Sequence, residues 1–415
     1  KETGSVAEPE RSDDVRKRNR GRVLAALRRH GALSRKDISA TTSLSPSTVS
    51  AITSELLEED VICIAGGIPP APVGRGRPQV QLALNPDAAL VASAVVKLDR
   101  ISATVSNYAG EKIAVTTSMF RPRRASPEAF FQFLTETLRT ALGKVPQQER
   151  RLTRIRIGVQ GATDVRGSSM LWSPITPHRN LQFKQVLESE FGVPVHVSND
   201  CNMMARALHW QAPDLFDRNF AAVLMSNGIG MGLMLNGELV KGTRSSGAEF
   251  GHLSHVPDGA LCRCGRRGCI EAYAGDYAIY RRAHGEAETT SPRNDISQDD
   301  MDAVREAAAR NDPQALSAYR EAGQALGTGL ADMFALVDSF PVAFIGNGTA
   351  AFEYMEEPLR TAIAATRLDA LSAAIEIHCF PDDIPLIQEG CAVTALQEQD
   401  DQFAHTAITA VKATA

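Results

Sequence analysis

The stretch GHLSHVPDGALCRCGRRGCIEAY, residues 251–273, carries the strongest chemical signal in the sequence. Its histidine and three cysteines follow the spacing H-x9-C-x-C-x4-C, which corresponds to His252, Cys262, Cys264 and Cys269. Three thiolates and one imidazole this close together predict a closed tetrahedral Zn²⁺ site, with one structural ion per chain. A closed site has no open coordination position, so this zinc would hold a loop and would not activate water.

Two alternatives stand beside this assignment. His255 offers the same donor three residues after His252, and the cysteines could form a buried cluster without a metal. The other four cysteines are scattered and are expected to pack as small apolar side chains: Cys63, Cys201, Cys379 and Cys391. An odd total of seven cysteines argues against a disulfide scaffold and favours the reducing cytoplasm.

The chain around this stretch has the composition of a globular protein. It has 415 residues, of which 43% are hydrophobic and 22% charged, so two to four folding units are expected. No segment approaches the roughly 18–20 uninterrupted apolar residues of a membrane span, so no membrane partner is expected.

The charge is divided unevenly along the chain. Residues 1–84 hold 13 Lys and Arg against 10 Asp and Glu, whereas the remainder holds 31 against 39. Nine basic residues and no acidic residue lie between Arg16 and Lys36, a pattern typical of phosphate contacts but also of a solvated helix face.

The same N-terminal part has the pattern of a winged helix-turn-helix, expected over residues 15–84 after a flexible tail at 1–14. One helix is predicted from Val15 to His30, a second after the N-cap Ser34, and a third after Ser45 and Pro46. Two strand-like runs, VICIAGG and PQVQLALNP, flank the loop IPPAPVGRGRP.

Operator DNA is the expected partner of this unit. The third helix leaves small polar side chains outward at Ser47, Thr48 and Ser50, as recognition helices do in the major groove. Arg75 and Arg77 in the wing are placed to reach a minor groove or backbone phosphates. A plain protein-interaction module remains the alternative.

From Asn85 onward, apolar β-rich runs alternate with helical stretches, which predicts an α/β fold. Two lobes with a cleft between them are expected, at residues 85–200 and 201–415. The second lobe includes the zinc motif, and the C-terminal helix is expected to return to the first lobe.

The sequence resembles the ROK family of bacterial transcriptional repressors and sugar kinases. The resemblance rests on the zinc segment with its lead-in GAEFGH and its trailing CIEAY, and on the N-terminal GRGRP wing that is similar to the repressor branch. It implies an actin/hexokinase-like domain after the winged helix, and it favours His252 over His255 as the zinc ligand.

The resemblance also implies a sugar site. The VSNDCN segment matches the family's Asn-Asp motif, which places Asn199 and Asp200 against sugar hydroxyls; Glu249, His252 and Glu271 match the remaining polar positions. Carboxylates and amides that converge in a cleft suit the donor and acceptor hydroxyls of a hexose.

Kinase activity is not expected from this sequence. The resemblance makes Asp200 the general base if the chain were a kinase, but the family's first phosphate motif, Asp-x-Gly-Gly-Thr, is absent: Val95 stands at the Asp position and no Gly pair follows. The glycine-rich element from Ser226 to Gly232 is equally compatible with a hairpin turn and with a phosphate loop.

These features together predict a sugar-responsive transcriptional regulator of the repressor type, a homodimer or homotetramer in the cytoplasm that is associated with the nucleoid when bound to DNA. A sugar or sugar derivative is the expected effector, as inducer or as co-repressor. An ATP-dependent sugar kinase is the alternative, and a protein partner in place of a free sugar is a third reading.

Overall fold

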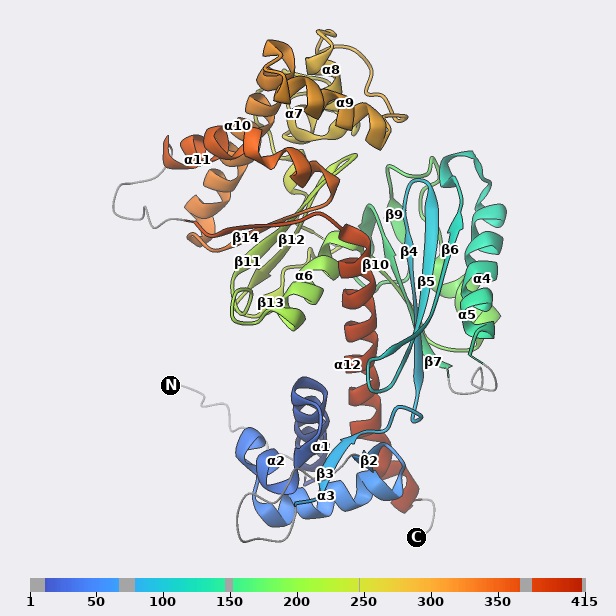
Figure 1. Ribbon diagram of the computed structural model, residues 1–415. Coiled ribbons are helices and arrows are strands. Elements are labelled where there is room, and N and C mark those ends of the chain that lie inside the picture. Colours follow the sequence, from blue (N-terminus) through green and yellow to red (C-terminus); the bar gives the residue numbers. More distant parts are fainter. Residues whose placement is uncertain (1–11, 67–78, 146–151, 246, 366–374, 413–415) are drawn as a thin grey trace, which may run out of the picture.

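The protein has an N-terminal helical unit at one end, two α/β lobes at the other, and a long C-terminal helix that connects them (Figure 1). The computed structural model describes residues 12–66, 79–145, 152–245, 247–365 and 375–412. Arg75, Arg77 and the first eleven residues of the predicted tail lie outside these ranges.

The N-terminal unit is a winged helix-turn-helix, as predicted. Its three helices pack around Leu24, Ile38 and Ile52, and the small sheet has the strand order β1-β3-β2. The elements are α1 (Ser12–His30), β1 (Leu33–Ser34), α2 (Arg35–Thr42), α3 (Pro46–Glu58), β2 (Ile62–Ile64) and β3 (Gln81–Leu84).

Local hydrogen bonds explain where these helices begin. Ser34 forms a capping box with Asp37 at the start of α2, and Ser45 accepts from the backbone N–H of Thr48 at the start of α3. The first helix begins at Ser12, three residues before its expected start. Two aspartates in its first turn stabilise this start, because their negative charges interact favourably with the positive end of the helix dipole.

The first lobe is a five-stranded mixed sheet with the strand order β10-β7-β4-β5-β6. Phenylalanines and aliphatic side chains of α4 and α5 cover one face, and α12 lies on the other. The elements are β4 (Leu90–Val96), β5 (Arg100–Asn107), β6 (Lys112–Met119), α4 (Pro127–Gly143), β7 (Leu152–Val159), β8 (Ala162–Thr163), β9 (Met170–Trp172), α5 (Phe183–Phe191) and β10 (Val195–Asn199).

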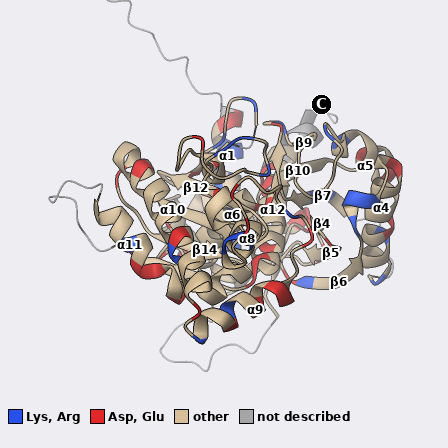
Figure 2. Ribbon diagram, turned by 90° about the horizontal axis from the view of Figure 1, so that it is seen from above, with Lys and Arg blue, Asp and Glu red and all other residues tan. Residues whose placement is uncertain are grey.

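The second lobe is a mixed sheet of the order β13-β12-β11-β14-β15, with α6 against one face and the helices α7 to α11 gathered on the other. The elements are α6 (Asp200–Gln211), β11 (Phe220–Met225), β12 (Ile229–Leu235), β13 (Glu238–Leu239), η3 (Phe250–His252), α7 (Glu271–Ala274), α8 (Asp276–Ala283), α9 (Gln298–Ala309), α10 (Pro313–Val337), β14 (Val342–Ile345), η4 (Asn347–Tyr354), α11 (Glu356–Ala365) and β15 (Ile377–Phe380). Acidic and basic segments are interspersed over both lobes (Figure 2).

The last helix, α12 (Asp383–Lys412), joins all three parts. It packs along α6, along the first-lobe strands β4 and β7, and against α1 of the winged helix. Its Ala395 and Leu396 belong to the same apolar cluster as Leu24 and Leu27 of α1, so the winged helix shares a core with the lobes. Within the described chain, no helix combines the length and apolar character that a membrane span requires.

Two arginines of the predicted basic cluster are used inside the molecule, whereas Arg16, Arg22 and Lys36 are exposed, so phosphate contact by the exposed members stays a prediction. Arg20 is fully buried and pairs with Glu59 at 2.5 Å. Arg28 pairs with Asp400 of α12, also at 2.5 Å, and its guanidinium lies 4.8 Å from the Tyr108 ring centroid. These arginines therefore hold the winged helix together and fix it to the rest of the chain.

Candidate functional site

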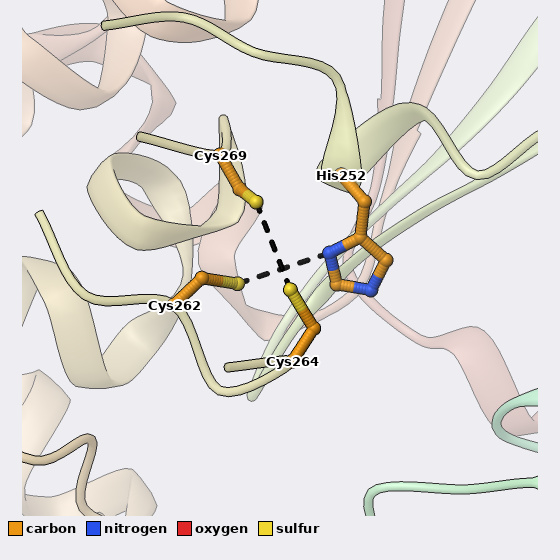
Figure 3. Close-up of side chains that lie close together, drawn as sticks. All are labelled: His252, Cys262, Cys264 and Cys269. Carbon is orange, nitrogen blue, oxygen red and sulfur yellow. Dashed lines mark hydrogen bonds between the residues drawn. The ribbon is translucent and has the colours of Figure 1, made fainter. Parts of the chain in front are cut away.

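The predicted zinc ligands converge at one point of the second lobe (Figure 3). His252 Nδ1 lies 3.8 Å from Cys262 Sγ, Cys264 Sγ lies 3.7 Å from Cys269 Sγ, and all four donor atoms lie within 4.8 Å of one another. A tetrahedron with metal–sulfur bonds of about 2.3 Å has edges of about 3.8 Å, so these donors fit a zinc ion. His255 lies outside this cluster, with its ring edge-on to Tyr273 at 5.1 Å.

The loop around these ligands depends on glycine. Gly265 and Gly268 have φ values of 90° and 75°, in the left-handed region that side chains disfavour. A Cβ on Gly268 would lie 1.7 Å from the carbonyl oxygen of Val256. This backbone crossing brings Cys269 back towards His252, and isolated bridges from Ser254 to Cys269 and from Leu261 to Arg267 stabilise it.

The carboxylates predicted to meet sugar lie beside this loop. Glu271 begins α7 two residues after Cys269 and is buried; its Oε2 accepts from the Ile229 N–H at 3.2 Å. The pKa of Glu249 is raised because protein atoms shield its carboxylate from water, and the charges of Glu271 and Asp200 raise it further against the opposing effect of His252. The charges of His252, Glu271 and Asp200 thus all act on the Glu249 carboxylate.

Asp200 lies at the N-terminus of α6, directly after its N-cap Asn199. Asn199 Oδ1 accepts from the Asn202 N–H, and its Nδ2 donates to the Gly161 carbonyl at 2.9 Å. Asp200 is 1% exposed; its Oδ1 accepts from the Cys201 N–H, while its Oδ2 has no hydrogen-bond partner among the described residues. Burial raises the pKa of Asp200, against the opposing charge of Lys97.

Lys97 was not recognised in the sequence. It directly follows β4, and its ammonium lies 2.5 Å from Asp383 Oδ2 and 3.6 Å from Asp200 Oδ2. The side chain is 13% exposed, and these two carboxylates raise its pKa against the effect of burial. A lone lysine at a strand end carries no signal in the sequence, because Asp383 lies 286 residues away.

A cavity of about 450 Å³ opens beside the metal loop. Trp172 and the segment that follows β9 line it on the first lobe, and Cys262 and Arg263 line it on the second. The Trp172 ring lies edge-on to His252 at 6.3 Å. None of the predicted sugar residues lines this cavity, and neither Trp172 nor Arg263 was singled out in the sequence.

The outward face of α3 matches the composition expected of a recognition helix. Ser47, Ser50, Ala51 and Ser54 are exposed. The hydroxyls of Ser47 and Thr48 lie within hydrogen-bond distance of Ser45 Oγ, so these two residues support the helix start, whereas Ser50 is exposed.

Comparison with known proteins agrees with this arrangement. The sequence pattern of the ROK family matches residues 91–380, and a pattern described as winged helix-turn-helix DNA-binding matches residues 16–62. The chain belongs to the ROK family.

Similar proteins include both branches of ROK. A solved ROK family transcriptional regulator, a homologue of the Escherichia coli MLC protein, has a TM-score of 0.76 at 23% identity and covers 94% of this chain and 98% of its own. The xylose repressor of Bacillus subtilis is 26% identical over 77% of this chain and 79% of its own. A glucokinase of Streptomyces coelicolor is 30% identical over 55% of this chain and 72% of its own.

Two segments that would bind the phosphates of ATP in a ROK kinase have other structural roles here. Val95 is completely buried inside the first-lobe sheet, and Lys97 follows two residues later. The glycine-rich element is a hairpin between β11 and β12, and a Cβ on Gly232 would lie 2.2 Å from the carbonyl oxygen of Cys201. Gly232 therefore lets α6 approach the sheet closely, which favours the hairpin interpretation.

The prediction that the scattered cysteines pack as small apolar side chains has a mixed outcome. Cys201 and Cys391 are buried as expected, but Cys379 is exposed, so its prediction as a packing residue is wrong.

Proposed function

We propose that this protein is a DNA-binding transcriptional repressor whose operator affinity changes when a sugar binds between its lobes. One observation carries the proposal: α6 and α12 both begin at the Lys97 ion cluster and both run to the winged helix. Asp200 and Asp383 are their first residues, while Trp210 near the end of α6 and Asp400 in the second half of α12 contact α1. The predicted effector site and the DNA-binding unit are thus connected by two packed helices.

At the effector end, Asp200 Oδ2 supports sugar binding. A buried carboxylate oxygen without a hydrogen bond is costly, and a sugar hydroxyl that donates to it would remove this cost. Glu249, His252, Glu271 and Asn199 complete the proposed set of contacts. The zinc ion would hold the loop that carries His252 and Glu271, and it supplies no chemistry beyond this structural role.

At the DNA end, the contacts are specific and partly buried. Arg28 donates to both oxygens of Asp400, and Arg29 lies 4.8 Å from the centroid of the Trp210 ring. A sugar that changes the packing of α6 against α12 would change these contacts. In a dimer it would alter the spacing of the two recognition helices, and by reciprocity operator DNA would alter the affinity for sugar.

Phosphoryl transfer is not part of the proposed function. Lys97 places a cation beside the carboxylate that would act as general base, and bulky residues replace the glycine pair that a phosphate needs. A coupled assay of ADP release over a panel of hexoses and amino sugars should show no turnover above background. Turnover at the rate of ordinary sugar kinases would overturn this part of the proposal.

The main test uses the full chain and an operator selected from genomic fragments. Fluorescence anisotropy should show a sugar-dependent change of operator affinity, together with a steep decrease of affinity with salt. Ser50→Glu should abolish operator binding, whereas Ala309→Glu, on the exposed face of α9, should not. Salt-independent binding, or the same operator affinity with every sugar of the panel, would contradict the proposal.

A further inference from the structure

A second cavity, of about 400 Å³, is lined by both helices that connect the proposed effector site with the winged helix. Its walls come from α6, α12, the strands β7 and β10 and the segments around Gly167 and Lys241. Asn199 is the one residue that it shares with the proposed sugar contacts. Its volume is within the range of about 300–1,000 Å³ that small-molecule sites occupy.

The walls of this cavity carry more free positive than free negative charge. Four cations line it: Arg156, Arg166, Arg206 and Lys241. Three carboxylates line it as well: Asp164, Glu398 and Asp401. Asp164 Oδ1 already accepts two backbone N–H groups, and Glu398 already pairs with Arg154 and Arg156, so the positive charge is only partly compensated.

Arg206 and Lys241 are two of the cations that line the cavity without an ion pair. Among the described residues, neither side chain makes a hydrogen bond or a salt bridge. Burial lowers the pKa of Arg206, and the charge of Arg156 lowers it further against the opposing effect of Glu238. Desolvation likewise lowers the pKa of Lys241, with added repulsion from Arg206 and Arg156. Arg206 is partly buried and Lys241 is exposed at the rim, so a bound anion would offset the mutual repulsion of these cations.

We infer that this cavity is a binding site for a phosphate group, carried by a small metabolite or present as inorganic phosphate. Guanidinium groups bind phosphate through paired N–H donors, and both Arg156 of β7 and Arg206 of α6 line the cavity. The lysine adds a third cation at the rim. The inference does not require that a sugar binds at Asp200.

A bound phosphate would act on the same two helices as the proposed sugar. It would compete with Glu398 for Arg156, and Glu398 lies two residues before Asp400, which holds Arg28 of the winged helix. It would also attract Arg206, one helical turn before Trp210, which contacts Arg29. Phosphate occupancy is therefore expected to shift operator affinity.

Isothermal titration calorimetry of the full chain in a chloride buffer tests the site. Inorganic phosphate, a hexose 6-phosphate and the unphosphorylated hexose are the three ligands. One phosphate-bearing ligand should bind per chain, and Arg206→Gln should weaken it by about tenfold or more. Arg310→Gln, at the exposed C-cap of α9, is the matched control and should leave the affinity unchanged.

Two further variants keep the test decisive. Lys241→Gln at the rim should also weaken phosphate binding, and Glu398→Gln should strengthen it, because the competing carboxylate charge is lost. Tighter binding of the ester identifies a phosphorylated metabolite, and equal affinities identify inorganic phosphate. If neither compound binds at millimolar concentration, or if Arg206→Gln leaves both affinities unchanged, the inference is wrong. Loss of the sugar response with phosphate binding intact would count against the proposed function alone.

Discussion

The Lys97 ammonium lies 3.6 Å from the buried Asp200 carboxylate. Within the described chain, Asp200 forms an ion pair with no other cation. Lys97→Met would leave the charges of Asp200 and Asp383 facing each other without compensation. We expect a loss of about 3 kcal/mol in unfolding free energy, measured by urea denaturation. Arg100→Met removes an exposed pair with Asp99 and should cost less than about 1 kcal/mol; equal losses in both variants would contradict the role of Lys97.

Gly390 determines how closely α12 approaches α6. A Cβ at this position would lie 1.9 Å from the backbone oxygen of Met203. Gly390→Ala should therefore push the helices apart, lower the melting temperature and weaken the effect of sugar on operator affinity. Gly143→Ala, at the end of α4 where a Cβ meets no atom within 4 Å, is the control and should be neutral or slightly stabilising.

The metal cluster predicts one zinc ion per chain by elemental analysis. Cys264→Ser should remove the ion and lower the melting temperature by at least about 5 °C, because the loop then lacks its cross-link. Sugar affinity should fall at the same time. Cys379→Ser lies outside the cluster and should retain the metal; a chain that contains no zinc when purified without chelators would refute this prediction.

Asp276 gives the fold a pH dependence. Burial raises the pKa of this carboxyl to about 6, against the opposing charge of Arg263. The folded state therefore binds a proton at Asp276 more tightly than the unfolded state does. The resulting contribution to the unfolding free energy is complete below the unfolded pKa of 3.8 and is lost as pH rises through 6. Between pH 4.5 and 7.5, Asp276→Asn should remove about 2 kcal/mol of this pH dependence from the unfolding free energy. Asp299→Asn, in the exposed first turn of α9, should not.

The docking of the winged helix depends on Asp400. Asp400→Asn would leave Arg28 partly buried beside a neutral side chain, and α1 should then exchange its amide hydrogens faster. The sugar response of operator binding should weaken in the same variant. Asp401→Asn, at the next and exposed position, should leave the exchange of α1 unchanged; faster exchange there too would show that the ion pair is not the cause.

Local features were predictable from the sequence. The caps Ser34 and Ser45 act on backbone groups three residues away. Cys262, Cys264 and Cys269 fall within eight consecutive positions. Both patterns are therefore visible in a short window of sequence. Pairings between distant segments were not predictable. Arg28 and Asp400 are separated by 372 positions, which is why the sequence did not reveal that Arg28 fixes the winged helix to α12.

The length of α12 has a mechanical consequence. Its 30 residues span about 45 Å at 1.5 Å per residue. A tilt of only about 5° at the Asp383 end would displace the opposite end by about 4 Å, which slightly exceeds the 3.4 Å rise of one base pair. The length of the helix thus amplifies a small rotation at the ion cluster. A tilt too small to disturb the core would be enough to move a recognition helix out of register with its half-site.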